Sequence, residues 1–131
     1  MTGHTITNDG MKIVLNRTFK SSPDYSEPSL FKIGTGTTDP TTSDTDLETP
    51  VNINGSQTKS FVSGYPSLDE TNLEAEIRCF VTSTEANGNS LTEFGIFNND
   101  ATKKMFSRTT FTSISKTTSV QITFVEKDRL K

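Results

Sequence analysis

The clearest structural signal in this chain lies in the segment Leu73-Glu74-Ala75-Glu76-Ile77-Arg78-Cys79-Phe80-Val81-Thr82. Apolar and polar side chains alternate along it, so an extended backbone carries the apolar set on one face, and only Phe80 interrupts the polar face. A period of two residues is typical of a strand with one buried and one solvated face, as in antiparallel sheets. We therefore predict a β-strand over residues 73–82, with Cys79 as a buried thiol.

Three further strands are expected after this one, over residues 91–97, 104–111 and 119–126. The Asn87-Gly88 pair before the first of them is a strong local signal for a tight hairpin turn. Short polar connections separate the other strands. We predict that the four strands follow one another as a C-terminal β-meander in a single antiparallel sheet with one apolar face.

The predicted meander has a core patch and an ion pair. Its core is expected to contain Phe94, Ile96, Phe106 and Phe111. Gly95, in the middle of a strand, indicates a bulge or the close approach of another part of the chain. We expect Glu93 and Arg108 to form an exposed ion pair across two strands, which would stabilise the fold by at most about 1 kcal/mol.

The first half of the chain gives weaker signals. One face of an extended segment would carry the apolar residues Met11, Ile13, Leu15 and Phe19. This alternation predicts a strand over residues 11–19, and residues 1–10 are expected to be a flexible N-terminal arm. Apolar runs predict further strands near residues 30–33 and 59–65. We find no convincing helix.

These signals predict an all-β protein: an antiparallel, jelly-roll-like β-sandwich with long polar loops, forming a single domain over residues 11–131. Thr and Ser, which favour strands and turns, make up 38 of the 131 residues. Leu, Ile, Val and Phe together contribute only 30 residues, or about 23%, close to the level of about 20% below which chains are often disordered. We therefore expect a thin core that partner subunits complete.

Charge and hydropathy argue against two kinds of partner, nucleic acid and membrane. The chain has 13 basic and 16 acidic residues, a net charge of -3, and no basic cluster. Nucleic acid is therefore not expected to be a partner, because phosphate binding needs Lys and Arg gathered on one face. No apolar run approaches the roughly 20 residues that span a bilayer, and the first residues do not resemble a signal peptide. We expect no membrane association.

Catalytic chemistry is not expected. Cys79 is the only cysteine, so no disulfide can form within the chain, and His4 is the only histidine and falls in the expected arm. A nucleophile and base pair would therefore depend on a mobile residue. The absence of Trp weakens a carbohydrate-stacking groove, although glycan binding at loop tips stays open. We predict a protein without enzymatic activity and without a cofactor.

The most polar segment of the chain, residues 37–50, offers the only candidate metal ligands. Asp44, Asp46 and Glu48 stand at every second position. Such oxygen ligands suit Ca²⁺, but the glycine and distal Glu of a calcium-binding EF-hand loop are missing. We favour a loop that is solvated or hydrogen-bonded to its own backbone, and predict no metal site.

Two segments resemble structural proteins of tailed bacteriophages, from the tail fibre and baseplate region. The first, Phe31-Lys32-Ile33-Gly34-Thr35-Gly36-Thr37-Thr38-Asp39-Pro40-Thr41-Thr42-Ser43-Asp44-Thr45-Asp46-Leu47, is similar to their "GTGTT.PT..DT.L" stretch. The second consists of Leu91-Thr92-Glu93-Phe94-Gly95-Ile96-Phe97-Asn98, then Met105-Phe106-Ser107-Arg108-Thr109-Thr110-Phe111 and Ser115-Lys116, and is similar to their "E.GIF......LF.RT.F..I.K" pattern. By order and spacing the resemblance covers most of residues 30–126.

The resemblance implies a noncatalytic virion component located in the tail and assembled in the host cytoplasm. It implies other virion proteins as partners and a homo-oligomer, a trimer or hexamer. Ordering the polar loop costs roughly 1 to 2 kcal/mol per residue, so we expect contact with another subunit to fix it. The loop residues expected at this interface are Gly34, Gly36, Asp39, Pro40, Asp44 and Leu47. Two alternatives stay open: a capsid decoration or head-fibre protein, and a glycan-binding receptor-recognition module.

Overall fold

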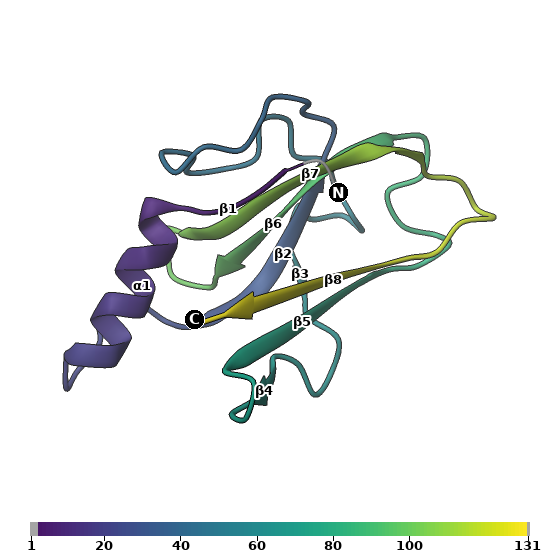
Figure 1. Cartoon of the computed structure of the whole chain (residues 1–131). Helices are drawn as coiled ribbons and strands as arrows, with labels where there is room; N and C mark the ends of the chain where they lie inside the picture. The colour runs from purple at the N-terminus through teal and green to yellow at the C-terminus, as the bar shows by residue number, and fades with distance from the viewer. Residues whose placement is uncertain (1–2, 131) are drawn as a thin grey trace.

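The computed structural model describes residues 3–130 as two antiparallel β-sheets and one helix (Figure 1). The larger sheet has the strand order β1-β7-β6-β2-β3 and the smaller sheet the order β4-β5-β8. The elements are β1 (Gly3–Ile6), α1 (Asn8–Phe19), β2 (Pro28–Gly34), β3 (Lys59–Ser60), β4 (Ser67–Asp69), β5 (Glu74–Val81), β6 (Ser90–Asn98), β7 (Met105–Ser115) and β8 (Ile122–Arg129). The prediction of an all-β, sandwich-like fold is confirmed.

The main core lies between the two sheets. Phe94 of β6 stacks on Phe124 of β8 with their ring centroids 4.8 Å apart, and the ring of Phe111 lies 5.2 Å from that of Phe124. All four predicted core residues belong to this cluster. Phe94 and Ile96 are fully buried in it, and Phe106 and Phe111 are partly buried against it. Cys79 is buried in the same cluster, as predicted.

The strand predicted first, β5, is present, but the four-strand meander is wrong. β5 pairs with β8, from Glu74 opposite Arg129 to Val81 opposite Ile122, whereas β6 and β7 pair with each other in the larger sheet. Residues 82–89 therefore connect two sheets and do not close a hairpin. This division lets the apolar face of β5 and β8 bury against the apolar face of β6, which a single flat sheet could not achieve.

The predicted strand over residues 11–19 is also wrong, because this segment is the helix α1. The Thr7 side chain caps it by accepting a hydrogen bond from the Gly10 N–H at 2.9 Å. Gly10 also lets the helix approach β7 closely, since a Cβ atom there would lie 2.2 Å from the Phe106 carbonyl oxygen. Three of the four alternating apolar residues, Met11, Leu15 and Phe19, also repeat at the four-residue spacing of a helix, and the capping threonine was the missed signal.

The N-terminal segment is not a free arm over the residues that the structure describes. Gly3–Ile6 forms β1, the edge strand of the larger sheet, and pairs antiparallel with β7. Residues 1 and 2 of the predicted arm lie outside the described residues. Of the strand predicted over residues 59–65, only Lys59–Ser60 pairs, with β2. Within residues 3–130, no helix has the length and apolarity needed to cross a bilayer.

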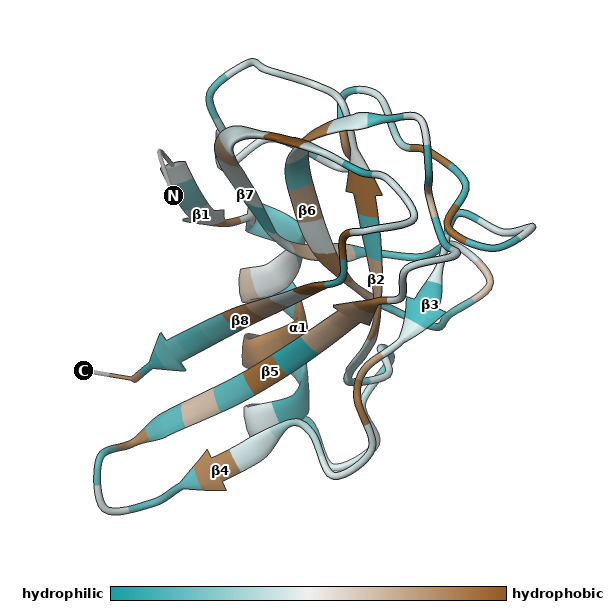
Figure 2. Ribbon diagram, turned by 90° about the vertical axis from the view of Figure 1, so that its right-hand side faces the viewer, coloured by the Kyte–Doolittle hydropathy of each residue, from teal (hydrophilic) through white to brown (hydrophobic). Residues whose placement is uncertain are grey.

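The two sheets diverge toward one end of the molecule. In Figure 2 the apolar ends of β5 and β8 lie near β2, while the polar ends of both strands extend away from the larger sheet. The helix α1 packs on β7 at this open end. The divergence leaves space between α1 and the smaller sheet.

Candidate functional site

The polar loop of residues 35–50 covers the outer face of the larger sheet (Figure 1). β6 is consequently buried along almost its whole length on both faces, by the smaller sheet on one side and the loop on the other. Leu47 anchors the loop in a second, smaller core with Phe97 and Met105, against which Leu30 packs.

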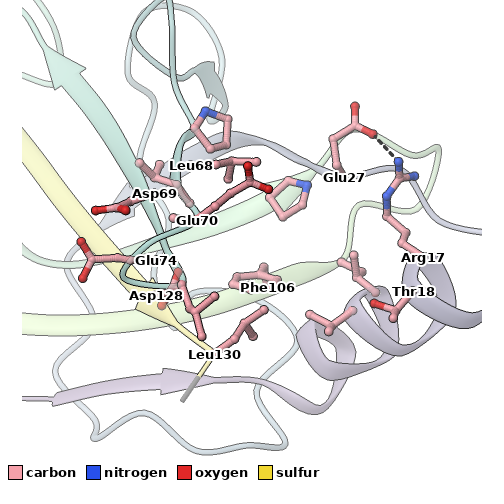
Figure 3. Close-up of a pocket in the computed structure, with 17 residues that line it drawn as sticks. Arg17, Thr18, Glu27, Leu68, Asp69, Glu70, Glu74, Phe106, Asp128 and Leu130 are labelled. Carbon is pink, nitrogen blue, oxygen red and sulfur yellow. Dashed lines mark ion pairs between the residues drawn. The ribbon is translucent and has the colours of Figure 1, made fainter.

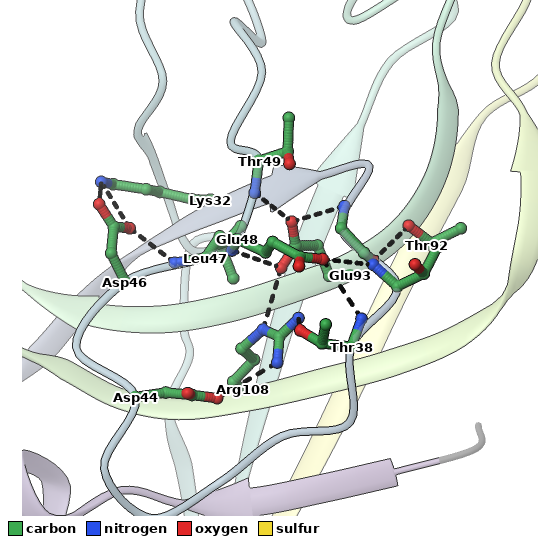
Figure 4. Close-up of polar contacts among 12 residues, drawn as sticks. Lys32, Thr38, Asp44, Asp46, Leu47, Glu48, Thr49, Thr92, Glu93 and Arg108 are labelled. Carbon is green, nitrogen blue, oxygen red and sulfur yellow. Dashed lines mark hydrogen bonds and ion pairs between the residues drawn. The ribbon is translucent and has the colours of Figure 1, made fainter.

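Glu93 holds the loop to the sheet (Figure 4). Its carboxylate accepts hydrogen bonds from the backbone N–H groups of Gly36 at 2.8 Å, Glu48 at 3.0 Å and Thr49 at 2.9 Å. It also accepts from Arg108 Nε at 2.9 Å. A carboxylate offers about four acceptor positions, and the three loop N–H groups together with Arg108 occupy all four on Glu93. We therefore assign the Glu93 carboxylate a structural role.

The ion pair between Glu93 and Arg108 is present as predicted, but it is buried and not exposed. The two residues have relative exposures of 0% and 1%. Arg108 reaches further into the loop, where its Nη1 lies 3.2 Å from Asp44 Oδ2 and its Nη2 lies 3.5 Å from Thr38 Oγ1. Removing one partner of a buried pair costs far more than the value expected for an exposed pair.

The three candidate metal ligands turn to separate partners. Asp44 binds Arg108 and the Thr41 backbone, and Asp46 pairs with Lys32 at 3.1 Å. Glu48 accepts from the Thr37 and Thr38 N–H groups at 2.7 and 3.2 Å. Asp44 and Asp46 therefore tie the loop to strands β7 and β2, and Glu48 ties the loop to itself.

Hydrogen bonding shifts the titration of two of these carboxyl groups. Burial alone would raise the pKa of Asp44, but hydrogen bonds from the Thr41 N–H and hydroxyl and the charge of Arg108 outweigh burial and lower it. Hydrogen bonds from the Thr38 and Thr37 backbones lower the pKa of Glu48. Both groups are therefore favoured in the charged form that the loop contacts require.

The remaining loop residues have different surroundings. Pro40 lies against β1, close to Gly3, and the Thr42 carbonyl accepts a hydrogen bond from the Asn8 N–H at 2.7 Å. Asp39 is exposed. The chain's own contacts hold this loop against the larger sheet, and the expectation that another subunit fixes it stays a prediction. Its role as a partner interface stays a prediction.

Glycines from both phage-like motifs allow the loop to lie this close. A Cβ atom on Gly36 would lie 2.4 Å from Glu48 Cβ and 2.5 Å from Glu93 Oε2, and one on Gly34 would lie 2.5 Å from the Thr49 carbonyl oxygen. A Cβ on Gly95 would lie 3.0 Å from Leu47 Cδ2. The close approach predicted for Gly95 is confirmed, and the two motifs meet in one structural unit.

Replacing Gly36 with Ala is expected to lower the free energy of unfolding by about 1–3 kcal/mol, because the added methyl group forces the loop away from Glu93. Hydrogen exchange should accelerate at the amides of Gly36, Glu48 and Thr49, which that carboxylate binds. Thr37→Ala, at an exposed neighbouring position, is the matched control and should leave these amides protected. Unchanged exchange in the Gly36 variant would contradict this role.

A second feature, an apolar cleft of about 620 Å³, lies between α1 and the diverging end of the smaller sheet (Figure 3). Its apolar lining consists of Ile13, Val14, Pro28, Pro66, Leu68, Leu73, Ala75, Ile77, Phe106 and Leu130. Acidic groups surround it, among them Asp69, Glu70 and Glu74. An ion pair between Arg17 Nη2 and Glu27 Oε2, which lie 3.2 Å apart, closes one side of the cleft. The sequence did not predict this cleft, because one of its walls is the helix that was assigned as a strand.

Large apolar side chains are exposed around this cleft and on the adjoining helix. Seven such side chains are exposed within residues 3–130, and six of them lie on α1 or line the cleft: Met11, Leu15, Phe19, Leu68, Leu73 and Leu130. Phe19 is 80% exposed and Leu68 is 74% exposed. A concentration of exposed apolar side chains marks an interaction surface.

Comparison of the chain with known protein families, curated proteins and solved structures finds no match.

Proposed function

We propose that this chain is a noncatalytic structural component of a tailed-phage virion, an oligomeric adaptor of the tail fibre and baseplate region that acts through protein–protein packing. The resemblance of its two motifs to phage tail proteins supports the location. The observation that carries the assembly role is the exposure of six large apolar side chains around one cleft and one helix. An isolated subunit gains nothing from leaving this apolar surface in water.

The two apolar surfaces complement each other in charge. The stripe of Met11, Leu15 and Phe19 on α1 is flanked by Lys12 and Lys20, whose side chains are 61% and 51% exposed. The cleft of a neighbouring copy offers an apolar floor with an acidic surround. In this proposal the stripe of one subunit occupies the cleft of the next. Such a head-to-tail contact gives a ring when the rotation between neighbouring subunits closes, and the expected trimer or hexamer is a ring of this kind.

Two sets of substitutions test this contact. Leu15→Ser with Phe19→Ser removes the stripe, and Leu68→Ser with Leu73→Ser removes the apolar cleft wall. Each variant is expected to be folded and monomeric by light scattering, whereas a mixture of the two should form a heterodimer through the one intact pair of surfaces. Val125→Ser, at the exposed apolar position outside both surfaces, is the control and should assemble normally. Oligomers of wild-type mass from either variant alone would exclude this interface.

The proposed location is tested on virions. Gold-labelled antibodies against the chain should decorate the tail end of purified particles in electron micrographs. Labelling over the head would instead support the capsid decoration or head-fibre alternative. Binding of the isolated protein on a glycan array, lost after substitution of carboxylates at the loop tips, would support the receptor-recognition alternative.

A further inference from the structure

A polar cluster lies where the edge strands of the two sheets come together. His4 of β1 and Glu126 and Asp128 of β8 each present one nitrogen or oxygen atom, and these three atoms lie within 4.8 Å of one another. His4 is more than 120 positions from both carboxylates in sequence, and the pairing of β1 with β7 brings it to this place. We propose that this cluster is a binding site for a divalent transition-metal ion of the Zn²⁺ class.

One nitrogen of His4 and one oxygen of Asp128 are spaced as two ligands of one ion. His4 Nε2 lies 3.3 Å from Asp128 Oδ1. Zinc bonds of about 2.0–2.2 Å in tetrahedral geometry place neighbouring ligand atoms about 3.3–3.6 Å apart. A direct charged hydrogen bond between the same atoms would be shorter, about 2.7–2.9 Å. The other ring nitrogen, Nδ1, lies 2.7 Å from Thr109 Oγ1, which leaves Nε2 directed toward Asp128.

Neither carboxylate has a Lys or Arg side chain within ion-pair range among the described residues. Asp128 Oδ2 has less than 1 Å² of accessible surface and no hydrogen-bond partner. Glu126 is only 4% exposed, and Ser107 Oγ is 2.9 and 2.8 Å from its two oxygens. Within residues 3–130, the only basic side chain in ion-pair range of either carboxylate is His4. A buried carboxylate keeps its negative charge only when it is paired or bound to a metal, and otherwise takes up a proton.

Neighbouring groups already orient the proposed ligands. The hydroxyl of Ser107 positions Glu126, and that of Thr109 positions the imidazole of His4. Both hydroxyls come from β7, the strand that pairs with β1. Such supporting hydrogen bonds are typical of metal sites. The His4 side chain is 34% exposed, so an ion can enter from solvent and water can complete its coordination.

The ion would connect the edge strand of the larger sheet to the edge strand of the smaller one. Because β1 and β8 belong to different sheets, no backbone ladder joins them. A metal bound only in the folded state stabilises that state. We therefore expect Zn²⁺ to raise the unfolding temperature and EDTA to reverse the increase.

The test uses tag-free, chelator-treated protein, because His4 is the only histidine in the chain and a histidine tag would bind the metal itself. Titration with ZnCl₂ in a calorimeter should show one ion bound per chain, and Co²⁺ should give the visible absorption of a tetrahedral site. The ¹⁵N resonances of the single imidazole should shift on Zn²⁺ addition. These readouts report on the wild-type protein and do not depend on the folding of any variant.

Substitutions assign the site. His4→Gln and Asp128→Asn should each weaken Zn²⁺ binding at least tenfold, while circular dichroism shows the fold retained. Glu76→Gln, at a partly buried carboxylate on the adjacent strand β5, is the matched control and should bind as the wild type does. Absence of Zn²⁺ binding by the wild-type protein would overturn the proposal and indicate that Glu126 and Asp128 share a proton instead. Equal binding by His4→Gln would overturn it as well.

Discussion

Replacing Glu93 with Gln is expected to lower the free energy of unfolding by about 3–5 kcal/mol, because it leaves the buried guanidinium of Arg108 without its fully buried counter-ion. The side chain keeps its shape, so the loss reports charge and hydrogen bonding rather than packing. The new amide NH₂ group also cannot accept from the loop N–H groups that the carboxylate now binds. Chemical denaturation monitored by circular dichroism measures the change.

Two comparisons define the origin of this loss. Asp44→Asn removes the other, partly exposed carboxylate near Arg108 and should cost clearly less. The double variant Glu93→Gln with Arg108→Met should be more stable than the sum of the two single effects predicts, since neither charge is left alone. Strict additivity, or a loss below 1 kcal/mol for Glu93→Gln, would show that the loop does not depend on this pair.

Phe94→Asp is expected to prevent folding. Phe94 is 1% exposed and its ring packs against those of Phe124 and Phe111. The loss of a buried phenylalanine costs about 3–5 kcal/mol, and an unpaired carboxylate in the same place adds several more. The total approaches the 5–15 kcal/mol that stabilises a typical domain.

Phe19→Asp is the matched control, because it introduces the same charge at a phenylalanine that is 80% exposed on α1. This variant should fold with near-native stability. Circular dichroism and the dispersion of amide resonances in NMR distinguish the two outcomes. A soluble, cooperatively folded Phe94→Asp protein would contradict the assignment of the inner face of β6.

Period-two patterning predicted the strands well where one face of a strand is buried. β5, β6, β7 and β8 lie within or near the predicted ranges, and the apolar face of β6 was identified through Phe94 and Ile96. The alternation of apolar and polar residues does not determine which strands pair, because β5 presents the same apolar face whether β6 or β8 is its neighbour. The assignment of four strands to one sheet failed for this reason.

The helix and the buried ion pair were harder to predict. In α1 only Gly10 and Ile13 are buried, so packing against the rest of the chain leaves little periodic signal. Glu93 and Arg108 lie on strands whose outer face would be solvated in a simple sandwich. Their burial results from the loop of residues 35–50, whose polar composition suggested an exposed segment. The cleft depends on the position of α1, so it too could not be inferred from the sequence.

The mass of the purified protein in solution shows whether this chain assembles with copies of itself, as we propose. Light scattering measured at several concentrations should give the mass of a closed trimer or hexamer that does not decrease on dilution. A folded protein that has the mass of one chain, 14.4 kDa, at every concentration would contradict the claim.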